Sequence, residues 1–181
     1  MLKAARTLTI AGLVLAMGFS AAEAGTVTVK GAHICCGSCV NGAKKALKDV
    51  DGVSSAAAER SGGTISFEAK DSKAAEAGIK ALAKAGYFGK AAHGDKTLKF
   101  PKSGAKKDAK ADTVTLTGVH LCCRACVNAA AKAAEDVKGV TKVDVDKTEK
   151  TVKLTGKDID VNKAVAALNG TGFFAKIEKK K

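Results

Sequence analysis

The sequence predicts an α+β protein made of two similar units in tandem, each with the order strand, helix, strand, strand, helix, strand. Two observations lead to this prediction. First, one phrase occurs twice: residues 33–41 read His-Ile-Cys-Cys-Gly-Ser-Cys-Val-Asn, and residues 120–128 read His-Leu-Cys-Cys-Arg-Ala-Cys-Val-Asn. Second, side chains alternate between apolar and polar before each phrase, and apolar residues recur at helical spacing after it. A repeat that extends well beyond a short motif indicates that one folding unit occurs twice.

The periodicities place the elements of both units in order. In the first unit we expect a strand at 26–30, a helix from Cys39, strands near 53–60 and 63–69, a helix near 72–85 and a last strand from Tyr87. In the second unit we expect a strand from Thr113, a helix from Cys126, strands near 140–146 and 150–155, a helix near 160–169 and a last strand from Phe173. Gly52 and Gly139 stand where a left-handed glycine ends the first helix of each unit.

This element order is the ferredoxin-like βαββαβ arrangement, in which two helices cover one face of a four-stranded antiparallel sheet. Residues 25–93 and 112–181 are therefore predicted to form two tandem domains. Residues 94–111 between them are rich in Lys, Gly, Asp and Ala and contain Pro101, which is the only proline. Such a composition is typical of a flexible linker.

Residues 1–24 have the pattern of a signal peptide. The basic residues Lys3 and Arg6 precede an uncharged apolar stretch, and Ala22-Glu23-Ala24 forms an A-x-A cleavage pattern. The apolar stretch is shorter than the ~20 residues that span a bilayer; an uncleaved anchor is the alternative interpretation. We therefore expect an exported protein, periplasmic or extracellular, that starts near Gly25 and is not stably inserted in a membrane after cleavage.

The net charge of +13 bears on the class of partner. A basic surface attracts anionic lipid, nucleic acid or an acidic protein. However, the lysines are scattered, aromatic residues make up 4% of the chain and Trp is absent, so the stacking platforms that bind single strands are lacking. We expect a solvated basic surface and no nucleic-acid partner. The sequence also offers no phosphate-binding loop and no catalytic base, so we do not expect an enzyme.

The repeated phrase contains every cysteine of the chain and two of its three histidines. Thiolates bind Cu(I), Zn(II) and Hg(II), and imidazole suits zinc and copper. Two cysteines three residues apart at the start of a helix can converge on one ion, which makes the C-x-x-C pairs the core candidate ligands: Cys36, Cys39, Cys123 and Cys126. The further candidate ligands are Cys35, Cys122, His33 and His120, because a Cys₃His set closes a tetrahedral zinc site.

The start of a helix also bears on thiol chemistry. The helix dipole favours the thiolate form, so we expect thiolates at Cys39 and Cys126. Arg124 is the only charged residue inside either C-x-x-C motif and should favour thiolates in the second copy. His93 has no counterpart in the repeat and is expected at the surface.

A βαββαβ unit with C-x-x-C between its first strand and first helix resembles the heavy-metal-associated domain. Cys36-Gly-Ser-Cys39 is followed by Gly52-Val53, and Cys123-Arg-Ala-Cys126 is followed at the same spacing by Gly139-Val140. Ala85-Gly-Tyr87 resembles the closing A-G-Y of that family, with Thr171-Gly-Phe173 as a looser counterpart. The family includes copper chaperones, modules of copper-pumping ATPases and periplasmic mercury-scavenging proteins. The resemblance implies a soft-metal site at each C-x-x-C and an aromatic ring at Tyr87 close to the metal loop.

The chain departs from the pattern of that family within the loop. Ile34 and Leu121 occupy the place of the family methionine, and each is flanked by an inserted histidine and an additional cysteine. The loop is therefore longer and richer in ligands than the two-coordinate Cu(I) site of the family.

The sequence thus favours an exported, non-enzymatic protein that scavenges, buffers or delivers copper, zinc or mercury. We expect about one ion per domain and a membrane metal transporter as a candidate partner. Two alternatives remain open. One is a thiol–disulfide redox protein of the cell envelope, because C-x-x-C at a helix start is also the thioredoxin arrangement. The other is an interaction module whose thiols are oxidised to disulfides.

Overall fold

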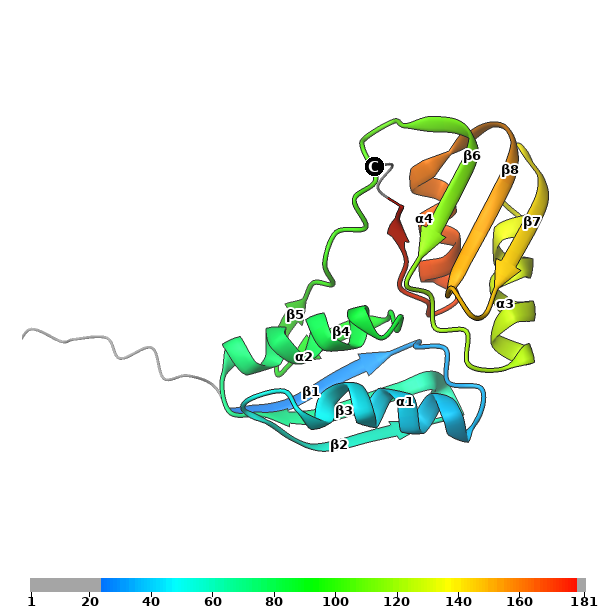
Figure 1. Ribbon diagram of the computed structural model, residues 1–181. Coiled ribbons are helices and arrows are strands. Elements are labelled where there is room, and N and C mark those ends of the chain that lie inside the picture. Colours follow the sequence, from blue (N-terminus) through cyan, green and yellow to red (C-terminus); the bar gives the residue numbers. More distant parts are fainter. Residues whose placement is uncertain (1–23, 179–181) are drawn as a thin grey trace, which may run out of the picture.

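A computed structural model describes residues 24–178 of the chain, and these residues form two βαββαβ domains (Figure 1). The predicted fold class, with a four-stranded antiparallel core sheet and two helices in each domain, is confirmed. The signal peptide predicted for residues 1–24 lies outside the described residues, apart from its last one. Among the residues that the structure describes, no helix is both long and apolar enough to cross a membrane.

The first domain consists of β1 (Gly25–Lys30), α1 (Gly37–Lys48), β2 (Val53–Glu59), a single 3₁₀ turn η1 (Ser61–Gly63), β3 (Thr64–Ala69), α2 (Ser72–Lys84), β4 (Lys90–His93) and β5 (Lys96–Leu98). The antiparallel sheet has the order β2-β3-β1-β4-β5. Alternating residues of β1 and β3 are buried, and they pack with the apolar faces of α1 and α2 in the core. Asp71 caps α2 by accepting a hydrogen bond from Ala74 N at 2.7 Å.

The second domain consists of β6 (Lys110–Thr117), α3 (Arg124–Glu135), β7 (Val140–Asp146), β8 (Thr151–Asp160), α4 (Val161–Gly170) and β9 (Lys176–Ile177). Its sheet has the order β7-β8-β6-β9. β8 is longer than expected because, after a register shift, Ile159 pairs with Ala111 of β6. Asp160 then caps α4 by accepting hydrogen bonds from Asn162 N and Lys163 N.

The last strand of each domain starts later than predicted, and the reason is a contact between the domains. β4 begins at Lys90 and β9 at Lys176, whereas Tyr87 and Phe173 pair with each other in an isolated antiparallel bridge. Beside this bridge, Phe88 N donates to Gly172 O at 3.0 Å and Phe174 N donates to Gly86 O at 2.9 Å. The residues expected to open two separate strands therefore join the two domains.

The range 94–111, predicted as a flexible linker, contains regular structure. It holds β5, which forms a hairpin with β4, and the first two residues of β6. Phe100 lies between the domains, with ring centroids 4.9 Å from Phe88 and 6.2 Å from Phe174. The segment between Phe100 and β6 lies against the second domain, where Ser103 O accepts a hydrogen bond from Ile177 N and Ala109 O accepts one from Val161 N.

His93 is not at the surface as expected. It is 4% exposed, because it lies in β4 and pairs with Val27 of β1. A side chain at Gly25 would come within 3.4 Å of its Nε2 atom, so His93 belongs to the sheet and lies away from the repeated phrase.

Two glycines allow the closing segment of each domain to reach the loop of the other. Gly86 and Gly172 have φ of +86° and +85°, a region that favours glycine. A Cβ at Gly86 would collide with the backbone N of His120, and a Cβ at Gly172 would collide with the backbone N of His33. Each glycine is therefore required for the backbone of its own domain to lie against the backbone of the cysteine loop of the other domain.

Replacing Gly172 with Ala should weaken this contact. A side chain at positive φ costs about 1–3 kcal/mol, and the new Cβ also meets the backbone of the 31–33 segment. We expect a loss of that size in the free energy of unfolding measured by urea denaturation. Gly170→Ala is the matched control, because Gly170 is exposed and has open space around it. A Gly172→Ala protein as stable as the Gly170→Ala protein would contradict the prediction.

Candidate metal centre

The two repeated phrases form matching loops that meet at the domain contact, where Figure 1 shows the loops after β1 and β6 close together. Ile34 and Leu121 are buried and anchor the loops, at 5% and 3% exposure. The chain is extended at the cap residues Cys36 and Cys123, and α1 and α3 begin at the next residue. Cys39 and Cys126 follow in the first turn of the helices and are buried.

All six thiols form one connected group. Sγ–Sγ distances across the domain boundary are as short as those within a motif: 3.4 Å for Cys39–Cys122 and 3.5 Å for Cys35–Cys123, against 3.6 Å for Cys36–Cys39. Six further pairs lie 3.5 to 3.9 Å apart. All six cysteines carry free thiols. The structure thus brings together two sets of candidate ligands that the sequence assigns to separate domains.

Both loop histidines join this group. Ligand atoms of His33, Cys35 and Cys126 lie within 4.8 Å of one another, as do those of His120, Cys39, Cys122 and Cys126. The His33 ring stacks on Phe173, with centroids 4.3 Å apart, and is hydrogen-bonded to the backbone of Thr171. Its Nε2 atom is buried without a hydrogen-bond partner. A half-buried imidazole held through one nitrogen, with the other nitrogen buried and unpaired, is suited to metal ligation.

The second histidine has a different environment. The ring of His120 stacks on Tyr87, with centroids 4.3 Å apart, and His120 Nε2 lies 3.1 Å from the Tyr87 hydroxyl. This hydroxyl donates to Cys39 O at 2.7 Å. Tyr87 is therefore close to the metal loop of its own domain, as the resemblance implies. Phe173, its counterpart, has no hydroxyl, so the two halves of the centre are not equivalent.

A small residue in α1 accommodates this hydroxyl. A Cβ at Gly42 would lie 2.5 Å from the Tyr87 oxygen. The equivalent position of the second repeat is Ala129, and the residue equivalent to Tyr87 is Phe173. Sequence reasoning missed Gly42, although the paired differences Gly/Ala and Tyr/Phe between the repeats are a signal that could have found it.

Arg60 is a further residue that the sequence did not indicate. It lies at the end of β2, and its Nε donates to Cys35 O at 3.1 Å. It fixes the backbone of the first loop beside the additional cysteine. No motif marks such a contact, because it depends on how the β2–β3 turn folds back over the loop.

The electrostatics of the centre divide the thiols into two kinds. A hydrogen bond from the backbone N–H of Cys39 is the largest cause that lowers the pKa of Cys36 to about 6, and one from the backbone N–H of Cys126 is the largest cause that lowers the pKa of Cys123. Burial instead raises the pKa values of Cys35, Cys122 and Cys126. The thiols at the helix caps therefore ionise most readily.

This division corrects one expectation. The expectation that Cys126 favours the thiolate is wrong, because its sulfur is buried among other thiols and its pKa is raised. The first-turn N–H groups point toward the cap position and favour the thiolate there. An effect of Arg124 on the thiols of the second copy stays a prediction.

Burial also keeps the imidazoles neutral. It lowers the pKa of His120 to about 4 and lowers the pKa of His33. Both rings are therefore unprotonated at pH 7, which is the form that coordinates a metal. Six sulfurs and two neutral imidazoles in one place are a soft donor set, suited to zinc or copper through both ligand types and to mercury through sulfur.

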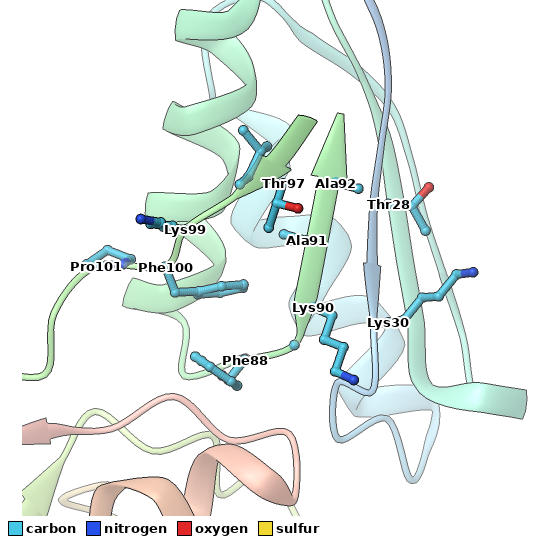
Figure 2. A pocket seen from close by; sticks show the side chains of 12 residues that line it. Thr28, Lys30, Phe88, Lys90, Ala91, Ala92, Thr97, Lys99, Phe100 and Pro101 are labelled. Carbon is cyan, nitrogen blue, oxygen red and sulfur yellow. The ribbon is translucent and has the colours of Figure 1, made fainter. Parts of the chain in front are cut away.

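The groove shown in Figure 2 offers different chemistry. It has a volume of 830 Å³ and lies along β1, β4 and β5. Its ionisable lining residues are Lys30, Lys90 and Lys99, and neither Cys nor His is among the described residues that line it. It is a basic, partly apolar surface without soft ligands, so the thiol group is the stronger candidate site.

Comparisons with known proteins find similarity among solved structures. No protein-family model and no curated protein sequence matches the chain. The crystal structure of oxidized MerP from Ralstonia metallidurans CH34 is 30% identical over 39% of this chain and 100% of that chain, with a TM-score of 0.36. The chain belongs to the heavy-metal-associated family.

Two other solved structures are similar to this chain over 45% and 87% of its length. The apo form of the HMA domain of a copper chaperone for superoxide dismutase is 26% identical over 45% of this chain and 86% of that chain, with a TM-score of 0.34. The N-terminal soluble domains of Bacillus subtilis CopA are 20% identical over 87% of this chain and 95% of that chain, with a TM-score of 0.32.

The pKa of Cys36 predicts the order of thiol alkylation. In the reduced, metal-free protein the reaction of Cys36 with iodoacetamide should be half-maximal near pH 6, because the thiolate predominates above its pKa of about 6. Cys35 and Cys122 should react much more slowly at pH 7, and mass spectrometry of peptides after brief labelling identifies the order. In denaturant all six thiols should follow the ordinary profile near pH 8.5. Equal labelling of Cys35 and Cys36 in the folded protein would show that the prediction is wrong.

The Gly42–Tyr87 contact predicts an energetic coupling. Gly42→Ala should cost about 1–3 kcal/mol of stability, because the methyl group overlaps the Tyr87 hydroxyl. In a Tyr87→Phe background the same substitution should cost less than about 0.5 kcal/mol, because the pair then matches Ala129 and Phe173. A double-mutant cycle of urea unfolding measures this coupling. Additive effects would contradict it.

Proposed function

We propose that this chain is an exported, non-enzymatic protein that binds soft metal ions and scavenges, buffers or delivers copper, zinc or mercury. The observation that carries the proposal is the convergence of six thiols and two neutral imidazoles at one domain contact. Buried polar groups are normally hydrogen-bonded, so an unpartnered Nε2 at His33 supports the role of a ligand.

The spacing of the sulfurs supports the proposal. In a tetrahedral site with metal–sulfur bonds of about 2.3 Å, neighbouring sulfurs lie about 3.8 Å apart. The thiols already stand 3.4 to 3.9 Å apart. A metal ion could therefore replace the thiol protons with small movements of the side chains.

The exposed edge of the centre supports a role in delivery. Gly37 and Ser38 in one motif, and Arg124 and Ala125 in the other, are exposed beside the half-buried cap cysteines. Competing thiols of a partner, such as a membrane metal transporter, could approach from this edge. Export is supported by the A-x-A pattern that ends at Ala24.

A thiol–disulfide redox role is the second candidate, and one observation favours it. Cys36 has a pKa of about 6, and its sulfur lies 3.6 Å from that of Cys39. Its thiolate could attack a substrate disulfide, after which Cys39 would release the substrate dithiol and leave a Cys36–Cys39 disulfide. Cys122 lies 3.9 Å from Cys36 and would compete with Cys39, which weighs against this role.

The deciding experiment offers Cu(I), Zn(II) and Hg(II) in competition to the reduced protein without oxygen. We expect tightly bound metal by mass spectrometry, together with thiols protected from Ellman's reagent, because the ligands lie within bonding reach. Cys36→Ser should lose metal, whereas the control Ser38→Ala, an exposed change inside the same motif, should retain it. Fully reactive thiols without tightly bound metal in the wild-type protein would overturn the proposal. If the wild-type protein then reduced the disulfides of insulin, this result would support the redox role.

A further inference from the structure

Sγ–Sγ distances of 3.4 to 3.9 Å connect all six thiols, and they allow one division into two sets of three mutually close sulfurs, each of which draws on both domains. In the first set, Cys35 lies 3.5 Å from Cys123 and 3.5 Å from Cys126, which are themselves 3.6 Å apart. In the second set, Cys122 lies 3.9 Å from Cys36 and 3.4 Å from Cys39, which are 3.6 Å apart. Each set therefore combines the C-x-x-C pair of one domain with the additional cysteine of the other.

The histidines follow this division in part, because Cys126 of the first set is grouped with both of them. His33 is grouped with Cys35 of its own loop and with Cys126 of the other domain. His120 is grouped with Cys122 and Cys126 of its own domain and with Cys39 of the other. Each imidazole thus lies near the set that contains the additional cysteine of its own domain.

We propose that the protein has two metal sites, each built across the domain boundary. One site comprises Cys123, Cys126, Cys35 and His33, and the other comprises Cys36, Cys39, Cys122 and His120. This assignment rests on the proposed metal-binding function and specifies its ligands. Each of the eight candidate ligands is used once, and each site receives the three sulfurs and one imidazole of a closed tetrahedral zinc site.

The backbone explains why a site within one domain is less suitable. Cys36 is extended, with φ of −151° and ψ of 173°. Successive side chains of an extended chain point to opposite sides, which disfavours ligation of one ion by both Cys35 and Cys36, although their Sγ atoms lie within 4.8 Å of each other. Cys35 accordingly lies 3.5 Å from Cys123 of the other domain, and the same reasoning applies to Cys122 and Cys123.

The domain contact presents these ligands before a metal arrives. The bridge between Tyr87 and Phe173 and the hydrogen bond from His33 N to Gly172 O, 3.2 Å long, hold each loop against the opposite domain. An ion at either site would add bonds across the same contact. Metal binding is then coupled to the docking of the domains.

A pair of half-site proteins tests the crossed arrangement, with Co(II) as a spectroscopic probe for Zn(II). The background Cys123→Ser/Cys126→Ser removes the pair of one site and should still bind about one Co(II) per chain, because a tetrahedral set remains. Adding Cys122→Ser should remove about one third of the thiolate-to-cobalt charge-transfer absorbance and weaken binding at least about tenfold. Adding Cys35→Ser should change neither.

In the reciprocal background, Cys36→Ser/Cys39→Ser, adding Cys35→Ser should weaken Co(II) binding and adding Cys122→Ser should leave it unchanged. Circular dichroism verifies that every variant is folded. Sensitivity to Cys35→Ser but not to Cys122→Ser in the first background would show ligation within one domain and overturn the assignment. Loss of all metal in either background would indicate a single shared cluster and would also overturn it. A wild-type protein that binds none of Co(II), Zn(II) or Cu(I) would instead refute the proposed function itself.

Discussion

The antiparallel bridge between Tyr87 and Phe173 is the contact on which the rest of the site depends. Two main-chain hydrogen bonds flank it, and the positive φ of Gly86 and Gly172 lets each segment lie directly against the opposite loop. Without this contact each C-x-x-C pair would face solvent at the end of its own domain. With it, six sulfurs and two imidazoles are brought together in one place. The loops supply the ligands, and packing between the domains sets how these ligands are arranged.

Duplication explains both the symmetry of the site and its departure from symmetry. Equivalent residues of the two repeats occupy equivalent places, so each loop meets the closing segment of the other domain. The departures are Tyr87 against Phe173 and Gly42 against Ala129. Tyr87 gives His120 Nε2 a hydroxyl neighbour, whereas Nε2 of His33 has no partner. The Nε2 atom of His120 is thus hydrogen-bonded, whereas the same atom of His33 is unpaired.

Much of the fold could be predicted from the sequence, because alternation and helical spacing reflect burial within each domain. The same local patterns explain why all eight candidate ligands could be named and why their arrangement could not. Tyr87 and Phe173 have the character of strand residues, and no periodicity shows that their partners lie in the other domain. The order of thiol acidity was missed for a similar reason: it depends on which sulfur lies at the helix cap and which is buried, as Cys36 and Cys126 show.

These acidities suit a site that captures a metal ion in steps. Metal binding to thiols releases their protons, so the most acidic thiols are the easiest first ligands. Cys36 and Cys123 ionise readily and lie beside the exposed edge, whereas burial raises the pKa values of Cys35, Cys122 and Cys126. Buried thiolates without a cation would be costly in free energy. Protonated thiols in the interior therefore keep the empty site stable, and an arriving cation removes the cost of their ionisation as it binds.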